Sequence, residues 1–186
     1  MGVSMRSLKH AVAAFLILGP ALATAQVQSD RSKELLQQLH DADPVGAAKI
    51  ERELDLVWAR SGSPSMDLLL TRGQDALEAG EVDTAIGHFS ALIDHAPDFA
   101  EAYHRRATAF YRQEEYGLAL SDLGFALTLN PDHFEAMYGL GVILETLGKE
   151  EEAFGAYSKV LDTYPTHERA LEATERLRAR VAGKTL

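Results

Sequence analysis

Cysteine is absent from the 186-residue sequence. Its absence excludes disulfide bonds, thiol nucleophiles, cysteine-ligated zinc and iron–sulfur clusters, and also the lipid-bearing cysteine of a bacterial lipoprotein. The motifs of nucleotide binding, zinc-dependent hydrolysis and serine hydrolysis are missing as well. We therefore expect a protein that is not an enzyme and needs no cofactor or metal.

Positive charge is scarce, since 18 lysines and arginines face 28 aspartates and glutamates, for a net charge of −10. Nucleic-acid binding depends on basic side chains that neutralise phosphates, and anionic membrane surfaces attract the same residues. The charge balance therefore disfavours both classes of partner. It is compatible with a basic partner, although solubility alone explains it equally well.

Long hydrophobic runs are also missing, and the apolar run near the N-terminus covers only residues 11–18. A membrane-spanning helix needs about 20 such residues. Arg6 and Lys9 precede the run and small residues follow it, which is the order of a secretory signal peptide. We predict a signal peptide over residues 1–25, cleaved near Ala25; an uncleaved anchor is the alternative. Export without cysteine favours the bacterial periplasm, because small secreted eukaryotic domains commonly rely on disulfides.

Proline recurs at 34-residue intervals and alanine keeps the same step, at Pro97, Pro131, Pro165 and at Ala85, Ala119, Ala153. A fixed period between 20 and 50 residues indicates a stacked repeat architecture. Within each period two stretches have apolar residues three or four positions apart, which predicts two amphipathic helices. The repeats are expected over residues 66–99, 100–133 and 134–167.

Small residues mark the positions at which the paired helices should touch. The first helix of each pair carries Gly73, Ala107 or Gly141 midway, and the second carries one of the periodic alanines near its start. A larger side chain there would overpack the contact at a cost of ~1–3 kcal/mol. The periodic prolines should end the second helices, because proline cannot donate an amide hydrogen and disfavours helical geometry in the residue before it.

Two Asp-x-x-Glu sequences follow the prolines, at Asp98–Glu101 and Asp132–Glu135. This is the spacing of a capping box, in which two side chains bind free amides at a helix N-terminus. We predict that Glu101 and Glu135 are helix caps. Among the histidines, His88 and His95 lie about two turns apart on one helix and are interpreted as surface residues, because two ligands at that distance do not share one zinc ion.

Further helices are expected on both sides of the repeats. Residues 168–182 predict a helix that covers the last repeat, before a short tail at 183–186. Residues 26–65 predict a helical hairpin, whose second helix begins near Pro44 and carries Trp58, which we expect to be packed. This hairpin misses the repeat register, so we interpret it as an N-terminal cap or a degenerate repeat.

The repeat pattern resembles that of the tetratricopeptide repeat (TPR) family. Its third unit matches best, with Met137-x-x-Leu140-Gly141-x-x-Leu144, then Ala153-x-x-x-Tyr157 and Pro165. The first unit departs most, with Arg72 and Ala76 where leucine and an aromatic residue are usual. The resemblance implies an all-α, right-handed solenoid of three helical hairpins within a TPR domain over residues 66–182.

Proteins of this family line a concave groove with the first helix of each repeat. The resemblance places in that groove Gln74, His104, Thr108, Tyr111, Arg112, Tyr138 and Glu145. Family members that bind the acidic C-terminus of a chaperone use lysines and asparagines there, whereas this chain has Leu70, His104, Tyr138, Gln74, Thr108 and Val142 at the corresponding positions. The resemblance therefore implies a different peptide or protein partner.

The expected function is that of a periplasmic interaction module or scaffold that holds a peptide or protein in its groove. The alternative is a structural subunit or assembly factor of a cell-envelope complex, which would dock through its convex face or through the N-terminal hairpin.

Overall fold

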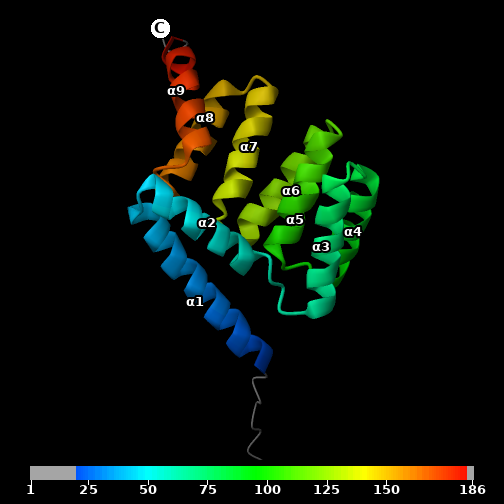
Figure 1. Cartoon of the computed structure of the whole chain (residues 1–186). Coiled ribbons are helices and arrows are strands. Elements are labelled where there is room, and N and C mark those ends of the chain that lie inside the picture. Colours follow the sequence, from blue (N-terminus) through cyan, green and yellow to red (C-terminus); the bar gives the residue numbers. More distant parts are fainter. Residues whose placement is uncertain (1–19, 184–186) are drawn as a thin grey trace, which may run out of the picture.

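The fold is all-α, as predicted. A computed structural model describes residues 20–183, and within that range it contains nine helices and no strand (Figure 1). They are α1 (Pro20–Asp41), α2 (Pro44–Trp58), α3 (Pro64–Glu78), α4 (Val82–His95), α5 (Ala100–Arg112), α6 (Tyr116–Leu129), α7 (Phe134–Thr146), α8 (Glu150–Thr163) and α9 (Glu168–Gly183). In this described range no helix combines the length and the hydrophobicity needed to cross a bilayer.

Part of the predicted signal peptide, residues 1–19, and tail residues 184–186 lie outside the described residues. The predicted cleavage point near Ala25 falls within the span of α1.

The predicted repeats are helical hairpins, in which α3 pairs with α4, α5 with α6, and α7 with α8. The periodic alanines Ala85, Ala119 and Ala153 have no exposed surface, as their predicted place between helices requires. In the last helix, α9, Ala170, Ala173 and Leu177 are buried and belong to the core that includes α8. This helix therefore covers the end of the stack.

The glycines of the first helices are matched to the aromatic rings that they face. A Cβ atom added to Gly73 would lie 2.3 Å from the Phe89 ring, and one added to Gly141 would lie 2.6 Å from the Tyr157 ring. Side chains do not approach this closely, so only glycine leaves room for the rings. The second repeat has buried Ala107 and, in place of an aromatic residue, leucine at position 123.

The turns inside the repeats share one left-handed backbone conformation. Gly80 and Gly148 have φ values of 80° and 73°, and Glu114 has a φ of 61° at the equivalent position of the second repeat. Glutamate adopts this region only at a cost in free energy, whereas glycine does so freely. Glu114, which interrupts the glycine pattern in the sequence, therefore does not change the turn.

The predicted capping boxes are wrong. The N-cap of α5 is Phe99, which makes no side-chain cap hydrogen bond, and the N-cap of α7 is His133. A tight turn occupies the proline and the aspartate before each helix: the Phe99 amide donates to the Ala96 carbonyl oxygen at 3.1 Å, and the His133 amide donates to that of Asn130 at 3.2 Å. Asp98 and Asp132 consequently lie one residue too early to cap these helices.

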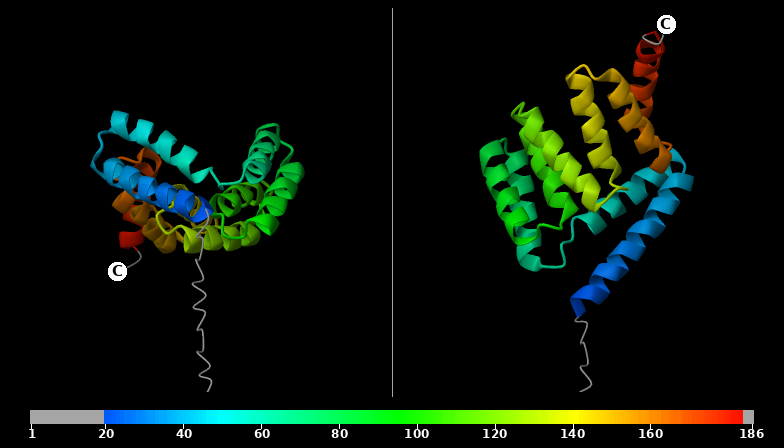
Figure 2. Two further views of the ribbon diagram at one scale, coloured as in Figure 1. Left: turned by 90° about the horizontal axis from the view of Figure 1, so that it is seen from below. Right: turned by 180° about the vertical axis from the view of Figure 1, so that it is seen from behind.

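The repeats curve into an arc, and the N-terminal hairpin of α1 and α2 lies over its open side (Figure 2). Leu35, Leu39 and Leu54 of this hairpin are fully buried, in a core that they share with the third repeat and α9. The hairpin thus packs against the far end of the stack. At the near end, Leu68 of α3 remains 49% exposed.

Candidate functional site

The concave side of the arc contains a groove with a cavity of about 500 Å³. Its lining comes from α5 and α7, with single residues from α6 and α9 and two from α2. Because α2 lies outside the repeats, one side of the groove is built by the N-terminal hairpin. Four of the predicted site residues line this cavity, namely His104, Thr108, Tyr111 and Tyr138.

The other three predicted residues are not part of the cavity lining. Arg112 donates to the main-chain carbonyl of Leu77 at the end of α3. Glu145 accepts a hydrogen bond from the Tyr157 hydroxyl at 3.0 Å and one from Arg176 at 2.8 Å. Arg112 and Glu145 therefore join neighbouring helices. Gln74 lies half-buried on α3.

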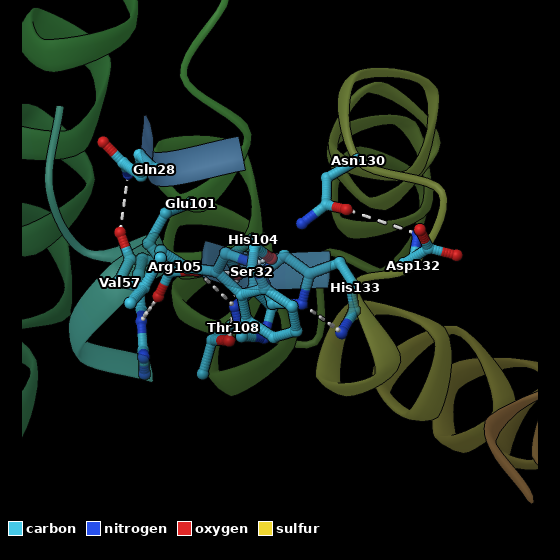
Figure 3. A network of polar contacts seen from close by, with 12 residues as sticks. Gln28, Ser32, Val57, Glu101, His104, Arg105, Thr108, Asn130, Asp132 and His133 are labelled. Atoms are coloured by element: carbon cyan, nitrogen blue, oxygen red, sulfur yellow. Dashed lines mark hydrogen bonds and ion pairs between the residues drawn. The ribbon is translucent and has the colours of Figure 1, made fainter. Parts of the chain in front are cut away.

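Glu101, predicted to be a cap, is instead a buried carboxylate between the second and third repeats (Figure 3). Its Oε2 atom lies 2.8 Å from His133 Nε2, and its Oε1 atom accepts from Arg105. Burial on its own would raise the pKa of the Glu101 carboxyl. The two histidines, His104 and His133, and Arg105 outweigh burial and hold that pKa well below its usual value.

Hydrogen bonding assigns the proton of His133. Its Nδ1 accepts from the Ala136 amide at 3.3 Å, so the proton lies on Nε2 and is donated to Glu101. A related contact occurs one repeat later, where His167 Nδ1 accepts from the Ala170 amide at 3.1 Å and Nε2 lies 3.5 Å from the carboxylate of Glu135. Each histidine therefore connects the start of one helix to a glutamate of the preceding repeat.

Sequence reasoning missed these contacts although the signal was present. His133 and His167 each follow a periodic proline by two residues and are themselves 34 residues apart. The repeat period relates these two histidines, whereas spacing along a single helix does not.

Glu101, His104 and His133 also bring ligand-type atoms within 4.8 Å of one another. Coordination by His133 Nε2 would displace the proton that binds Glu101, and the only other position for that proton faces the Ala136 amide hydrogen. Arg105 would add a positive charge beside the ion. The hydrogen bonds of this cluster therefore favour a connection between repeats over a metal site.

The charges around the groove are mostly negative. Arg169 of α9 lies 2.7 Å from the Glu135 carboxylate and covers the Tyr138 ring, with 4.5 Å between the guanidinium carbon and the ring centre. Burial would raise the pKa of Glu135, but His167 and Arg169 lower it to about 2. Glu135 is therefore charged and already neutralised by residues of the chain.

Asp55 of α2 is in a different situation. Burial raises the pKa of its carboxyl to about 6, Glu101, Glu135 and Glu51 act in the same direction, and Arg105 alone opposes them. Within the described residues its carboxylate makes no hydrogen bond and no ion pair. Asp55 is thus a half-buried acid in the groove without a directly bonded cation.

Trp58 is packed, as predicted. Only 8% of its surface is exposed, and its ring centre lies 4.5 Å from that of His133 and 5.3 Å from that of Phe134. Its Nε1 donates to the Ser32 hydroxyl at 2.9 Å. Trp58 therefore attaches the N-terminal hairpin to the start of α7, beside the Glu101 cluster.

Comparison with known proteins agrees with this geometry. The protein-family model of the tetratricopeptide repeat matches residues 70–124 and 104–168. The chain belongs to the tetratricopeptide repeat family. A TPR repeat-containing protein of Rhizobium etli is 32% identical over 154 residues, which is 82% of this chain and 76% of that protein.

Other TPR proteins match a smaller share of the chain. The human DnaJ homolog subfamily C member 3 is 35% identical over 108 residues, which is 58% of this chain and 21% of that protein. Among solved structures, the first TPR of Spaghetti (RPAP3) bound to the HSP90 peptide SRMEEVD has a TM-score of 0.61 and 26% identity, and covers 63% of this chain and 93% of that one. MamA, with a TM-score of 0.60 and 22% identity over 76% of this chain and 86% of its own, shares the fold.

Proposed function

We propose that this TPR protein holds a peptide segment or protein partner in the groove formed by α2, α5 and α7. The observation that carries the proposal is the cavity itself, which four of the seven predicted groove residues line. Tyr111 is 37% exposed there, and tyrosines are enriched among the residues that dominate binding energies. A similar TPR domain holds the peptide SRMEEVD, which supports peptide binding by this fold.

A pull-down tests the groove. Tyr111→Ala and Thr108→Arg remove an exposed ring and obstruct the cavity, while Phe125→Ala on α6 changes a side chain outside the cavity lining. We expect the groove variants to lose a partner captured from periplasmic extract and Phe125→Ala to keep it. Loss of the partner only in Phe125→Ala would instead support docking through the outer surface of α6.

Docking through α6 is the second candidate function, that of a subunit or assembly factor in a cell-envelope complex. Three apolar side chains lie at helical spacing on α6 and remain 40–54% exposed, namely Leu118, Phe125 and Leu129. Exposed apolar surface of this kind is typical of protein interfaces when it is contiguous.

We also propose that the protein is exported and cleaved near Ala25. A chain that begins near Gln26 keeps contacts that hold the hairpin, for example the hydrogen bond from Gln28 Nε2 to the Val57 carbonyl at 2.6 Å. The mass of the protein recovered from a periplasmic fraction should correspond to a chain that begins near Gln26. A chain that retains Met1 and sediments with membranes would support the uncleaved anchor instead.

A further inference from the structure

The groove differs from a plain TPR groove because α2 adds two acids to it. Glu51 and Asp55 are one helical turn apart, so they lie on the same face of α2, and both line the cavity. Glu51 already accepts a hydrogen bond from the Tyr164 hydroxyl at 3.2 Å. Asp55 has no such contact within the described residues, and it is therefore the acid that is open to a ligand.

The cations of the groove are already engaged. Arg105 binds Glu101, and Arg169 binds Glu135 at 2.7 Å. With Glu51 and Asp55 included, four carboxylates share these two guanidinium groups. The groove consequently has an excess of negative charge in a partly buried place, where charges interact more strongly than in water.

The histidine on the same wall does not supply the missing positive charge. His104 is only 9% exposed, and burial lowers the pKa of its imidazole, although Glu101 acts against this. Its Nδ1 atom is buried and lies 3.5 Å from Glu101 Oε2, without a hydrogen bond among the described residues. His104 therefore faces Glu101, and Asp55 is the polar group in the groove that lacks a partner among the described residues and could bind a polar group of a ligand.

Apolar surface continues along the groove from these polar groups. Tyr111 of α5 and Val142 of α7 line the cavity together with Leu123. The aliphatic stems of lysine and arginine pack on such surface while their cationic ends reach a carboxylate, and tyrosine rings attract the same cations.

We propose that this groove selects peptide segments that carry a lysine or arginine, whose cationic group pairs with Asp55 beside Glu51. This inference rests on the proposed function and names the charge of the ligand. It gives the groove the opposite preference to that of a TPR domain holding the acidic peptide SRMEEVD. The N-terminal hairpin, and not the repeats, is the source of the preference.

The test uses the full chain and fluorescein-labelled nonapeptide pools, acetylated and amidated, with the central residue fixed as lysine, arginine, leucine or glutamate. We expect fluorescence anisotropy to show that the lysine or arginine pool binds about tenfold more tightly than the glutamate pool. Asp55→Asn should remove this difference. Far-UV circular dichroism confirms that the variant is folded, and Glu51→Gln, which keeps an acceptor for Tyr164, should weaken binding less.

Asp75→Asn is the matched control, because it changes the net charge by the same amount at an exposed position of α3 that does not line the cavity. It should leave the affinity for the basic pools within about twofold. Equal loss in Asp55→Asn and Asp75→Asn would show general attraction by an acidic protein and overturn the proposal.

Failure of the charge preference and failure of the peptide groove give different binding results. Equal binding of the lysine and glutamate pools, weakened by Tyr111→Ala, would overturn the charge preference and leave the groove as a peptide site. Binding of no pool by the folded protein would overturn the peptide groove and its charge preference together.

Discussion

At the scale of single residues, the contact between paired helices depends on glycine where an aromatic ring faces it. We expect Gly141→Ala to lower the stability by ~1–3 kcal/mol, because the new methyl group would meet the buried Tyr157 ring. The melting temperature should fall by about 2–4 °C for each kcal/mol. Gly155→Ala in α8 is the control, since nothing lies within 4 Å of its added Cβ atom and alanine favours the helix. A fall of equal size in both variants would contradict the predicted clash.

The turn of the second repeat should accept glycine, which is the residue at the equivalent position in the turns of the first and third repeats. Glu114 has a φ of 61°, and left-handed backbone costs a residue with a side chain ~1–2 kcal/mol. Glu114→Gly removes this cost but increases the flexibility of the unfolded chain. We expect a net gain of ~0.5–1 kcal/mol, seen as a higher urea midpoint. A lower midpoint would show that the glutamate side chain stabilises the turn.

At the scale of elements, His133 connects α7 to α5 through Glu101. His133→Phe keeps an aromatic ring at this position, as Phe99 does one repeat earlier. The substitution removes one hydrogen-bond donor to the buried Glu101 carboxylate. We expect a loss of ~1–3 kcal/mol in chemical unfolding. Glu101→Gln and the double variant complete a thermodynamic cycle, in which a coupling near zero would exclude the His133–Glu101 hydrogen bond as a stabilising contact.

Helix α2 inserts Asp55 into the groove, and this makes stability depend on pH. The folded-state pKa of about 6 lies above the value of about 3.9 for an unfolded chain. The folded form therefore binds the proton more tightly, and the stability that this group contributes below pH 4 is lost as the pH rises through 6. Asp55→Asn should match the wild-type melting temperature near pH 4 and exceed it near pH 7.5. A difference that does not change with pH would contradict this titration.

At the scale of the whole molecule, the core is divided into two clusters. The first joins repeats one and two and includes Ala136 and Ile143 of α7, and the second joins the N-terminal hairpin to the third repeat and α9. Leu39→Ala in α1 removes a fully buried side chain from the second cluster, at a cost of ~2–5 kcal/mol. Hydrogen exchange should accelerate in α7, α8 and α9 and change little in α3 and α4. Uniform acceleration would indicate that the whole protein opens as one unit.

Patterns along the chain are sufficient to predict the repeat. The step that joins Pro97, Pro131 and Pro165, with the buried alanines in the same register, predicted the helix pairs, because helix periodicity and proline chemistry act within a few residues of the chain. The family resemblance, and not the spacing, placed His104, Thr108, Tyr111 and Tyr138 in the groove, and all four line the cavity.

The contacts between the repeats depend on the tertiary fold. Glu101 has the spacing of a cap, yet it binds His133, which is 32 residues away, because a tight turn delays the helix start. The hairpin is local in sequence, yet its buried leucines pack against the third repeat and bring Asp55 into the groove. Contacts between residues so far apart in the chain follow from how whole helices pack, and local spacing does not encode them.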